Sequence, residues 1–218
     1  MKLRAKTKGR LRHHTNPLTY RADQLVVPDW ESALGGTPQE LDIGIGLGDF
    51  LCDYAALHPQ RRIVGLEVRE AFCDEARLRL GQREIDNAVV VHVDATRFLD
   101  QVLPADCIER AFVSFPDPWF KKRHHKRRLI TGDFLSKLHR VMVDQGEFLL
   151  QSDNEDLVEF MVEAIETSPY FVNENGAFQT VEEPFSEAKT EREVYYAKRN
   201  LPVWRYRYRC QKDERDSA

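Results

Sequence analysis

Short apolar runs alternate with helical patterns through most of this sequence, and the alternation restricts the folds that the chain can adopt. The strand-like runs are ELDIGIG, RIVGLEV, AVVVHVDA, ERAFVSF and GEFLLQSD, and each is followed by a segment with helical spacing of apolar residues. Strands and helices in this order form a mostly parallel sheet with helices on both faces. The sequence therefore predicts an α/β, doubly wound domain.

The end of the chain has a different pattern. The segments 193–200 and 203–210 flank Leu201-Pro202 and are rich in tyrosine, so we expect them to pair as an antiparallel hairpin that finishes the sheet. No linker divides the chain, and a hydrophobic content of 42% can supply a core. We expect a basic N-terminal arm and lead-in segment over residues 1–36, one domain over 37–210 and a polar tail over 211–218.

Positive charge is concentrated in two stretches, although the whole chain has a formal net charge of −4. Residues 1–21 contain seven Lys or Arg, residues 119–128 contain six, and neither stretch contains an acid. A polyanion would therefore be attracted to particular regions of the surface. This distribution favours a nucleic acid as the partner.

The four cysteines are scattered, with no C-x-x-C pair and no histidine at the spacing of a metal ligand. This arrangement predicts reduced thiols, no disulfide framework and no bound metal. No apolar run approaches the roughly 20 residues that cross a bilayer. The basic N-terminus leads into Thr15-Asn16-Pro17 rather than into an apolar signal core. We expect a cytoplasmic protein with no membrane partner.

A glycine loop follows the first expected strand. Gly44, Gly46 and Gly48 stand where the backbone must approach a ligand and turn into a helix. The dinucleotide fingerprint G-x-G-x-x-G would require glycine at Asp49. An NAD-linked oxidoreductase therefore has only the general fold in its favour, and it leaves the basic run unexplained.

Acidic residues accompany three successive strands at their carboxyl ends: Asp42, Glu67 and Asp94. Parallel strands end at one edge of the sheet, so these carboxylates would line one crevice. Glu67 could accept hydrogen bonds from both hydroxyls of a ribose, and Asp94 would lie beside the edge of an adenine. Any one of them could equally cap a helix, but their shared register favours a ligand. A ligand that carries a ribose and an amino group, such as S-adenosylmethionine, suits three acids better than a ligand that carries a pyrophosphate does.

The fourth strand leads into SFPDPWFKKRHHKRRL, residues 114–129. Prolines on both sides of Asp117 restrict the backbone, so the carboxylate is held at the expected crevice. Trp119 and Phe120 can stack on unpaired bases, while the basic residues after them can hold phosphates. This combination beside a cofactor crevice favours RNA over a solvated loop.

The string PDPWFKKRHHKRR resembles the signature of the tRNA (guanine-N7-)-methyltransferase family. DIGIGLGDF, GLEV and VDA fall in the order and spacing of the same family, and the similarity extends from about Leu41 to the TERE of 190–193. The resemblance implies a Rossmann-like class I methyltransferase fold with an antiparallel C-terminal strand. It also implies a tRNA modification enzyme that transfers a methyl group from S-adenosylmethionine to N7 of a guanine in the tRNA variable loop, at position 46.

The resemblance assigns roles to individual residues. Asp117 corresponds to the family's catalytic acid. The expected cofactor contacts are Asp42, Gly44, Gly46, Gly48, Glu67, Asp94 and Asp117. The expected substrate contacts are Lys121, Asp153, Thr190, Glu191, Arg192 and Glu193. The last four replace the family's T-K-F-E by T-E-R-E. We expect tRNA to be held by residues 121–128 and the N-terminal arm, and the protein to be a monomer or a homodimer.

The chemistry gives Asp117 a role that does not depend on the family. Guanine N7 already carries a lone pair, so no proton has to be removed before it attacks a methyl group. A fixed carboxylate can stabilise the positive charge that develops on the purine. It can alternatively accept hydrogen bonds from guanine N1–H and N2–H2 and so orient the base.

Two other functions fit part of the pattern. The PDPW segment is similar to the D-P-P-[YFW] loop of methyltransferases that act on exocyclic amino groups of other bases, but the order of proline and acid differs. A catalytically silent tRNA-binding homologue would be consistent with TERE. The intact glycine loop and Asp117 argue against it.

Overall fold

The computed structural model describes residues 19–119 and 127–212, and the alternation predicted from the sequence is confirmed. The first five strands are β1 (Glu40–Ile43), β2 (Ile63–Glu67), β3 (Ala88–His92), β4 (Ile108–Ser114) and β5 (Met142–Ser152). The helices between and after them are α2 (Asp49–Leu57), α3 (Glu70–Gln82), α4 (Ala95–Val102), α5 (Gly132–Val141) and α6 (Glu155–Glu166). Two short helical segments, η2 (Ala22–Gln24) and α1 (Trp30–Leu34), precede β1.

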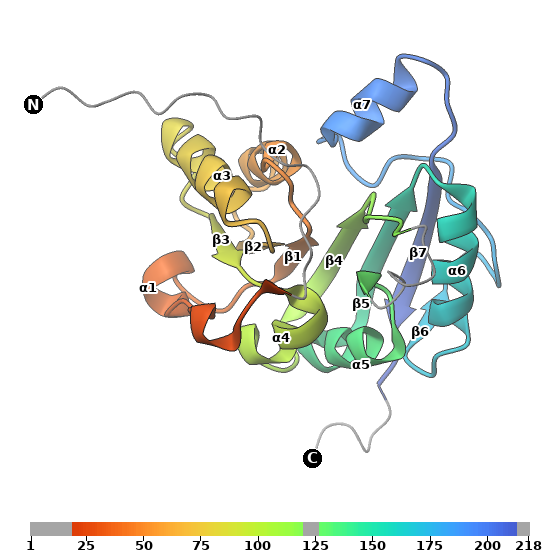
Figure 1. Ribbon diagram of the computed structural model, residues 1–218, viewed down its shortest axis with the longest axis horizontal. Coiled ribbons are helices and arrows are strands. Elements are labelled where there is room, and N and C mark those ends of the chain that lie inside the picture. The colour runs from red at the N-terminus through yellow and green to blue at the C-terminus, as the bar shows by residue number, and fades with distance from the viewer. Residues whose placement is uncertain (1–18, 120–126, 213–218) are drawn as a thin grey trace, which may run out of the picture.

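The strands form one sheet in the order β3-β2-β1-β4-β5-β7-β6 (Figure 1). Strands β1 to β5 are parallel, whereas β7 (Trp204–Cys210) is antiparallel to β5 and to β6 (Phe171–Asn173). The mostly parallel, doubly wound sheet with an antiparallel C-terminal strand is therefore confirmed. The direction of winding reverses between β1 and β4, which places the usual ligand crevice of such sheets at their carboxyl ends.

The predicted C-terminal hairpin is wrong. The segment expected to form its first strand is instead in helix α7 (Glu191–Ala197), and β7 pairs with β5 and β6. A capping box starts the helix: the Glu193 N–H donates to Thr190 Oγ1 at 3.0 Å, and the Thr190 N–H donates to Glu193 Oε2 at 2.9 Å. This reciprocal pairing satisfies two backbone donors at the helix start. It outweighs the strand preference of the two tyrosines.

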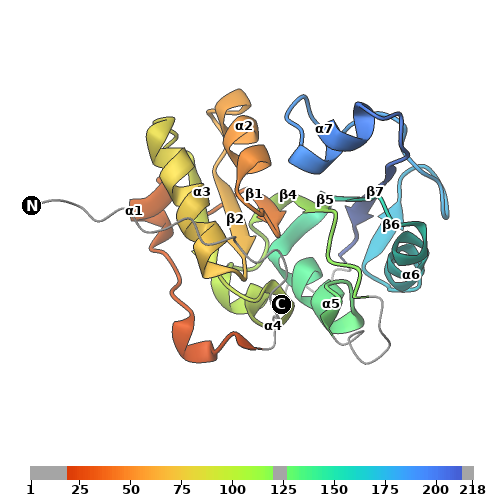
Figure 2. The same cartoon turned by 45° about the horizontal axis from the view of Figure 1, so that its top comes forward.

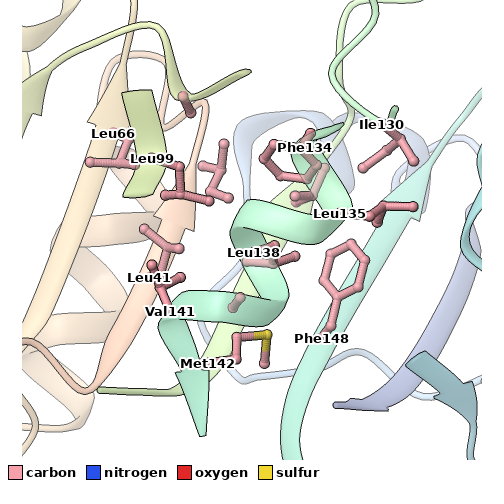
Figure 3. Close-up of a cluster of buried hydrophobic side chains, with 14 of the residues drawn as sticks. Leu41, Leu66, Leu99, Ile130, Phe134, Leu135, Leu138, Val141, Met142 and Phe148 are labelled. Atoms are coloured by element: carbon pink, nitrogen blue, oxygen red, sulfur yellow. The ribbon is translucent and has the colours of Figure 1, made fainter. Parts of the chain in front are cut away.

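Apolar side chains fill both faces of the sheet. Helices α2 and α3 pack over one face, and α4, α5 and α6 pack over the other (Figure 1). Figure 3 shows side chains from α5 meeting those of the neighbouring strands on the face covered by α4, α5 and α6. The residues labelled there are Leu41, Leu66, Leu99, Ile130, Phe134, Leu135, Leu138, Val141, Met142 and Phe148, all of which are buried. This packing fixes the strand ends relative to one another.

The lead-in segment packs on the domain over its described part. The Tyr20 hydroxyl donates to the His92 carbonyl at 3.0 Å, and its ring lies 5.6 Å from that of Phe98. Trp30 is also buried. The chain is thereby anchored beside the carboxyl end of β3. Within residues 19–119 and 127–212, no helix combines the length and apolar character needed to cross a bilayer.

Close packing of α2 on the sheet depends on the absence of a side chain at Gly65, in the middle of β2. A Cβ atom there would lie 2.7 Å from Leu51 Cδ2 and 2.8 Å from Ile45 Cγ2. Gly81, in the exposed last part of α3, has no described atom within 4 Å of the equivalent position.

We expect Gly65→Ala to lower the free energy of unfolding by about 1–3 kcal/mol, because a buried methyl group would overlap the side chains of Leu51 and Ile45, which must then shift. Gly81→Ala is the matched control and should raise it by about 0.5–1 kcal/mol, because alanine reduces the entropy lost on helix formation. Urea denaturation measures both values. Equal stability of the two variants would contradict the close contact.

Candidate active site

A groove runs along the carboxyl edge of the parallel strands. It consists of two adjoining pockets that share Gly44, Ser114 and Phe115. One pocket extends past the ends of β2 and β3, and the other lies between the glycine loop and the start of α7. Figure 2 shows α2 and α7 on the two sides of the ends of β1 and β4. The groove thus occupies the switch point of the sheet.

The glycine loop contributes to the groove at two of its three glycines. Gly44 lines both pockets and Gly46 lines the one beside α7. Gly48 lines neither pocket: it adopts a φ of 81° and stands directly before α2. A Cβ atom there would lie 2.7 Å from Ala76 Cβ, so this glycine permits α2 and α3 to approach each other.

Asp42 lies at the floor of the pocket beside α7, and only 3% of its surface is exposed. Burial raises the pKa of its carboxyl group to about 7, and the nearby charge of Glu67 adds to the shift. The ionised form is disfavoured because both effects penalise a negative charge in this position. A positively charged ligand group would relieve this penalty.

Glu67 connects the end of β2 to the glycine loop. Its Oε2 accepts a hydrogen bond from the Gly46 N–H at 3.1 Å, and its Oε1 accepts from the backbone N–H groups of Val68 and Arg69 at 2.9 and 3.0 Å. The carboxylate is buried in this network. It therefore fixes the loop on which the groove is built.

Arg69 is a residue of this site that the sequence analysis did not identify. Its Nε donates to Glu67 Oε1 at 2.9 Å and its Nη2 donates to Glu67 Oε2 at 2.8 Å. Burial lowers the pKa of Arg69, but its hydrogen bonds to Glu67 and the charges of Glu67 and Asp117 outweigh that effect and raise it. Its position two residues after a strand-end acid was the signal available in the sequence.

Asp94 caps helix α4 and lines the pocket at the ends of β2 and β3. Its Oδ1 accepts hydrogen bonds from the N–H and the hydroxyl of Thr96 at 3.1 and 2.5 Å. Its Oδ2 is buried and has no hydrogen-bond partner among the described residues. Burial raises the pKa of this carboxyl group against the effect of Thr96. A ligand with an N–H donor would satisfy the second oxygen.

Asp117 lies in the same pocket, after the end of β4. The residues on either side of the Pro-Asp-Pro segment have positive φ angles, 52° at Phe115 and 42° at Trp119. The segment is therefore sharply turned as well as restricted by its prolines. Pro116 and Trp119 line the pocket with Asp117.

The basic run is described only at its end. Arg127 lines the pocket, with its guanidinium 5.0 Å from the centre of the Trp119 ring. The Arg128 Nε donates to the Pro118 carbonyl at 3.3 Å, and its guanidinium lies over the Phe160 ring at 4.3 Å. Lys121, an expected substrate contact, lies outside the described residues together with the rest of 120–126.

The start of helix α7 brings three of the six expected substrate contacts to the groove. Thr190, Glu191 and Arg192 line the pocket that Asp42 also lines. The Arg192 Nη1 donates to both carboxylate oxygens of Asp153 at 3.3 Å. Its guanidinium lies 5.8 Å from the Phe115 ring, above the shared part of the groove. Asp153 and the start of α7 are therefore held together.

Glu193 lines neither pocket of the groove and is 5% exposed. Its Oε1 accepts from the Arg205 Nη2 at 3.5 Å. The Arg205 Nε donates to Gln151 Oε1 at 3.2 Å, and the Gln151 Nε2 donates to the Ser114 hydroxyl at 3.0 Å. This Glu193–Arg205–Gln151–Ser114 network links α7 to the groove. The sequence offered no signal for it, because its members lie on four separate elements.

No group of three or more His, Cys, Asp or Glu side chains is arranged to hold a metal ion within the described ranges.

Comparison with known proteins gives consistent results. Residues 37–206 match the family described as "Putative methyltransferase". The chain is 33% identical to the tRNA (guanine-N(7)-)-methyltransferase of Thermosynechococcus vestitus, covering 92% of this chain and 95% of the relative. It is 34% identical to the tRNA (guanine-N(7)-)-methyltransferase of Microcystis aeruginosa, with 93% and 98% covered.

Solved structures share the fold. The antibiotic-resistance methyltransferase Kmr aligns with a TM-score of 0.58 and 16% identity, covering 85% of this chain and 93% of that one. An rRNA methylase from Streptococcus thermophilus aligns with a TM-score of 0.53 and 13% identity, covering 83% and 91%. These likenesses confirm the expected class I methyltransferase fold.

The buried pair of Glu193 and Arg205 should hold α7 in place. Glu193→Ala removes the ion pair and the side-chain half of the capping box, so we expect the free energy of unfolding to fall by about 1–4 kcal/mol. Amide exchange over residues 194–197 should rise at least tenfold, as measured by hydrogen–deuterium exchange. Glu191→Ala, an exposed acid in the same turn, is the matched control and should change stability by about 0.5 kcal/mol or less. Equal exchange in the two variants would contradict the anchoring role.

Proposed function

Given that the chain belongs to the tRNA (guanine-N(7)-)-methyltransferase family, we propose that it methylates N7 of guanine 46 in the tRNA variable loop with S-adenosylmethionine as donor. The observation that carries the proposal is the unpartnered Oδ2 of Asp94, buried in a groove that Asp42, Glu67 and Asp117 also line. An adenine amino group is the kind of donor that this oxygen requires. The other acids suit the rest of the same ligand.

The residues of the groove fit S-adenosylmethionine one group at a time. Asp94 would accept a hydrogen bond from the adenine amino group, and Glu67 would accept from the ribose hydroxyls. Both Glu67 oxygens already accept from the Arg69 side chain, so the hydroxyls would have to displace that guanidinium. Asp42 would face the amino group of the methionine part, whose positive charge offsets the cost of ionising a buried carboxyl group.

S-adenosylmethionine, when bound, supplies a methyl group on a sulfonium that the guanine N7 lone pair can attack, with the S–CH3 bond breaking as the N7–CH3 bond forms. The residues of this chain do not need to remove a proton from N7. Asp117 would act either by stabilising the positive charge that develops on the purine or by accepting hydrogen bonds from N1–H and N2–H2. Both roles require a carboxylate that is fixed in position, which the turned Pro-Asp-Pro segment supports.

The described ends of both basic stretches lie at or near the groove, which supports tRNA as the substrate. Trp119 and Arg127, on either side of residues 120–126, line the pocket with Asp117. Tyr20, at the end of the basic arm, packs on Phe98 in the helix that Asp94 caps. A polyanion attracted to these stretches would be brought to the candidate site.

The substrate is tested by incubating the protein with unmodified tRNA transcript and radiolabelled S-adenosylmethionine. Borohydride and aniline then cleave the RNA at N7-methylguanine. We expect a single cut at position 46. Incorporated label without that cut would indicate another base or atom, and bound tRNA without label would indicate a silent binder.

Asp117→Asn should reduce kcat by about 10²–10³, because an amide stabilises developing positive charge poorly. Asp156→Asn, an exposed acid at the start of α6, is the control and should leave kcat unchanged. A tRNA with inosine at the target position distinguishes the two roles, because inosine lacks the N2 amino group. If Asp117 orients the base, inosine lowers the affinity of the wild type but not that of Asp117→Asn. Wild-type kcat in Asp117→Asn would contradict both roles.

Cofactor binding should release a proton at pH 6. Asp42 is mostly protonated there in the free protein, because its pKa is raised to about 7, whereas a bound ammonium group favours the ionised carboxylate. We expect release of up to one proton at pH 6 and very little at pH 8.5. Titration calorimetry in buffers of different ionisation enthalpy measures this number. Asp42→Asn should release about one proton fewer at pH 6, and equal release would contradict the assignment.

A further inference from the structure

The outer side of α7 carries an exposed aromatic ring that the mechanism does not use. Glu193 is the helix's one buried side chain, and Tyr195 is 50% exposed. The Arg199 guanidinium lies 3.8 Å from the centre of the Tyr195 ring, and its Nη1 donates to the Tyr195 carbonyl at 3.2 Å. The cation is therefore held against the ring rather than extended into solvent. An aromatic ring and a positioned cation form one surface.

This surface is continuous with the candidate active site. Tyr195 and Tyr196 line a hollow together with Asp153, Glu191 and Arg192. Glu191 and Arg192 also line the pocket between the glycine loop and α7. If one unit of a polymer enters the groove from this side, the unit next to it would lie over Tyr195.

The chemistry of the surface fits a nucleotide. The ring of Tyr195 can stack on a base of any sequence through the face that Arg199 does not cover, and the guanidinium over the other face can pair with the adjoining phosphate. Lys198, the C-cap of α7, and Arg199 after it add two positive charges, and the segment from Val194 to Asn200 contains no acid to offset them. This charge suits the phosphate backbone of RNA better than a basic or a purely apolar partner.

We propose that Tyr195 and Arg199 form a stacking platform for an unpaired tRNA nucleotide next to the target guanine. The proposal rests on the proposed function, because it takes tRNA as the substrate of the adjoining groove. Tyr195 supplies the face on which the base lies, and Arg199 contacts its phosphate. The platform would fix the path of the loop and so present the guanine to the groove.

The affinity of the full-length protein for tRNA transcript tests the platform. Tyr195→Ala and Tyr195→Leu should each weaken binding about tenfold, because stacking on a flat ring is lost, whereas Tyr195→Phe should bind like the wild type. Arg199→Ala should reduce the slope of log K against log salt by about one. The matched controls are Phe178→Ala and Arg83→Ala, which remove an exposed ring and an exposed cation elsewhere. Affinity for S-adenosylmethionine should be unchanged in all of them.

The RNA gives an independent measurement. An abasic nucleotide placed on each side of the target guanine in turn should weaken binding of the wild type at one of the two positions. The same change should have little effect on the affinity of Tyr195→Ala. If ring and base form a single contact, removing the ring already abolishes what the base contributes. Independent losses at both positions would overturn the proposal.

Two further outcomes separate the proposals. If the wild type methylates tRNA but Tyr195→Ala and Tyr195→Leu bind it as tightly as Phe178→Ala does, the platform alone is overturned. If the wild type does not methylate tRNA, the proposed function is overturned. Light scattering examines the other possible occupant. If the wild type is a dimer that Tyr195→Ala converts to a monomer, the surface is a contact between two copies of the chain, and the platform is overturned.

Discussion

Two acidic side chains, Asp42 and Glu67, are buried close together at the carboxyl edge of the sheet, and the groove is organised around their charge. Glu67 is stabilised by backbone N–H groups of the glycine loop and of the chain after β2, and by the Arg69 guanidinium. At Asp42, burial and the charge of Glu67 raise the pKa of the carboxyl group to about 7. The shift corresponds to about 4 kcal/mol disfavouring the ionised form. Such a cost at one edge of a closely packed sheet is typical of a ligand site.

The packing around Gly65 and Gly48 keeps these charges in place. Because α2 lies directly against β2 and α3, the loop between β1 and α2 has little freedom, and Gly46 is positioned to donate to Glu67. The apolar core on the other face fixes the ends of β3 and β4, from which Asp94 and Asp117 follow. The side of the groove formed by β1 to β4 is thus held by close apolar packing.

The opposite side of the groove is built differently. Helix α7 buries a carboxylate rather than an apolar stripe, and it is attached through Glu193–Arg205 and Arg192–Asp153. Contacts of this kind depend on specific geometry and exclude little apolar surface from water, so α7 can present its aromatic and basic side chains outward. Of the motif positions 190–193, the first three meet the groove, whereas Glu193 has a structural partner.

The sequence by itself determined the doubly wound sheet and the strands that end in Asp42, Glu67 and Asp94, because the period of apolar residues and the parallel direction of the strands bring those ends to one edge. It also determined the family through PDPWFKKRHHKRR. The T-x-x-E capping box was visible in the sequence, but the tyrosines after it favoured a strand. Only the tertiary structure decided that β7 pairs with β5 and β6, that the Arg69 side chain is hydrogen-bonded to Glu67, and that Arg205 anchors α7 through Glu193. Pairings of this kind join separate elements or depend on rotamers, and local sequence patterns do not specify them.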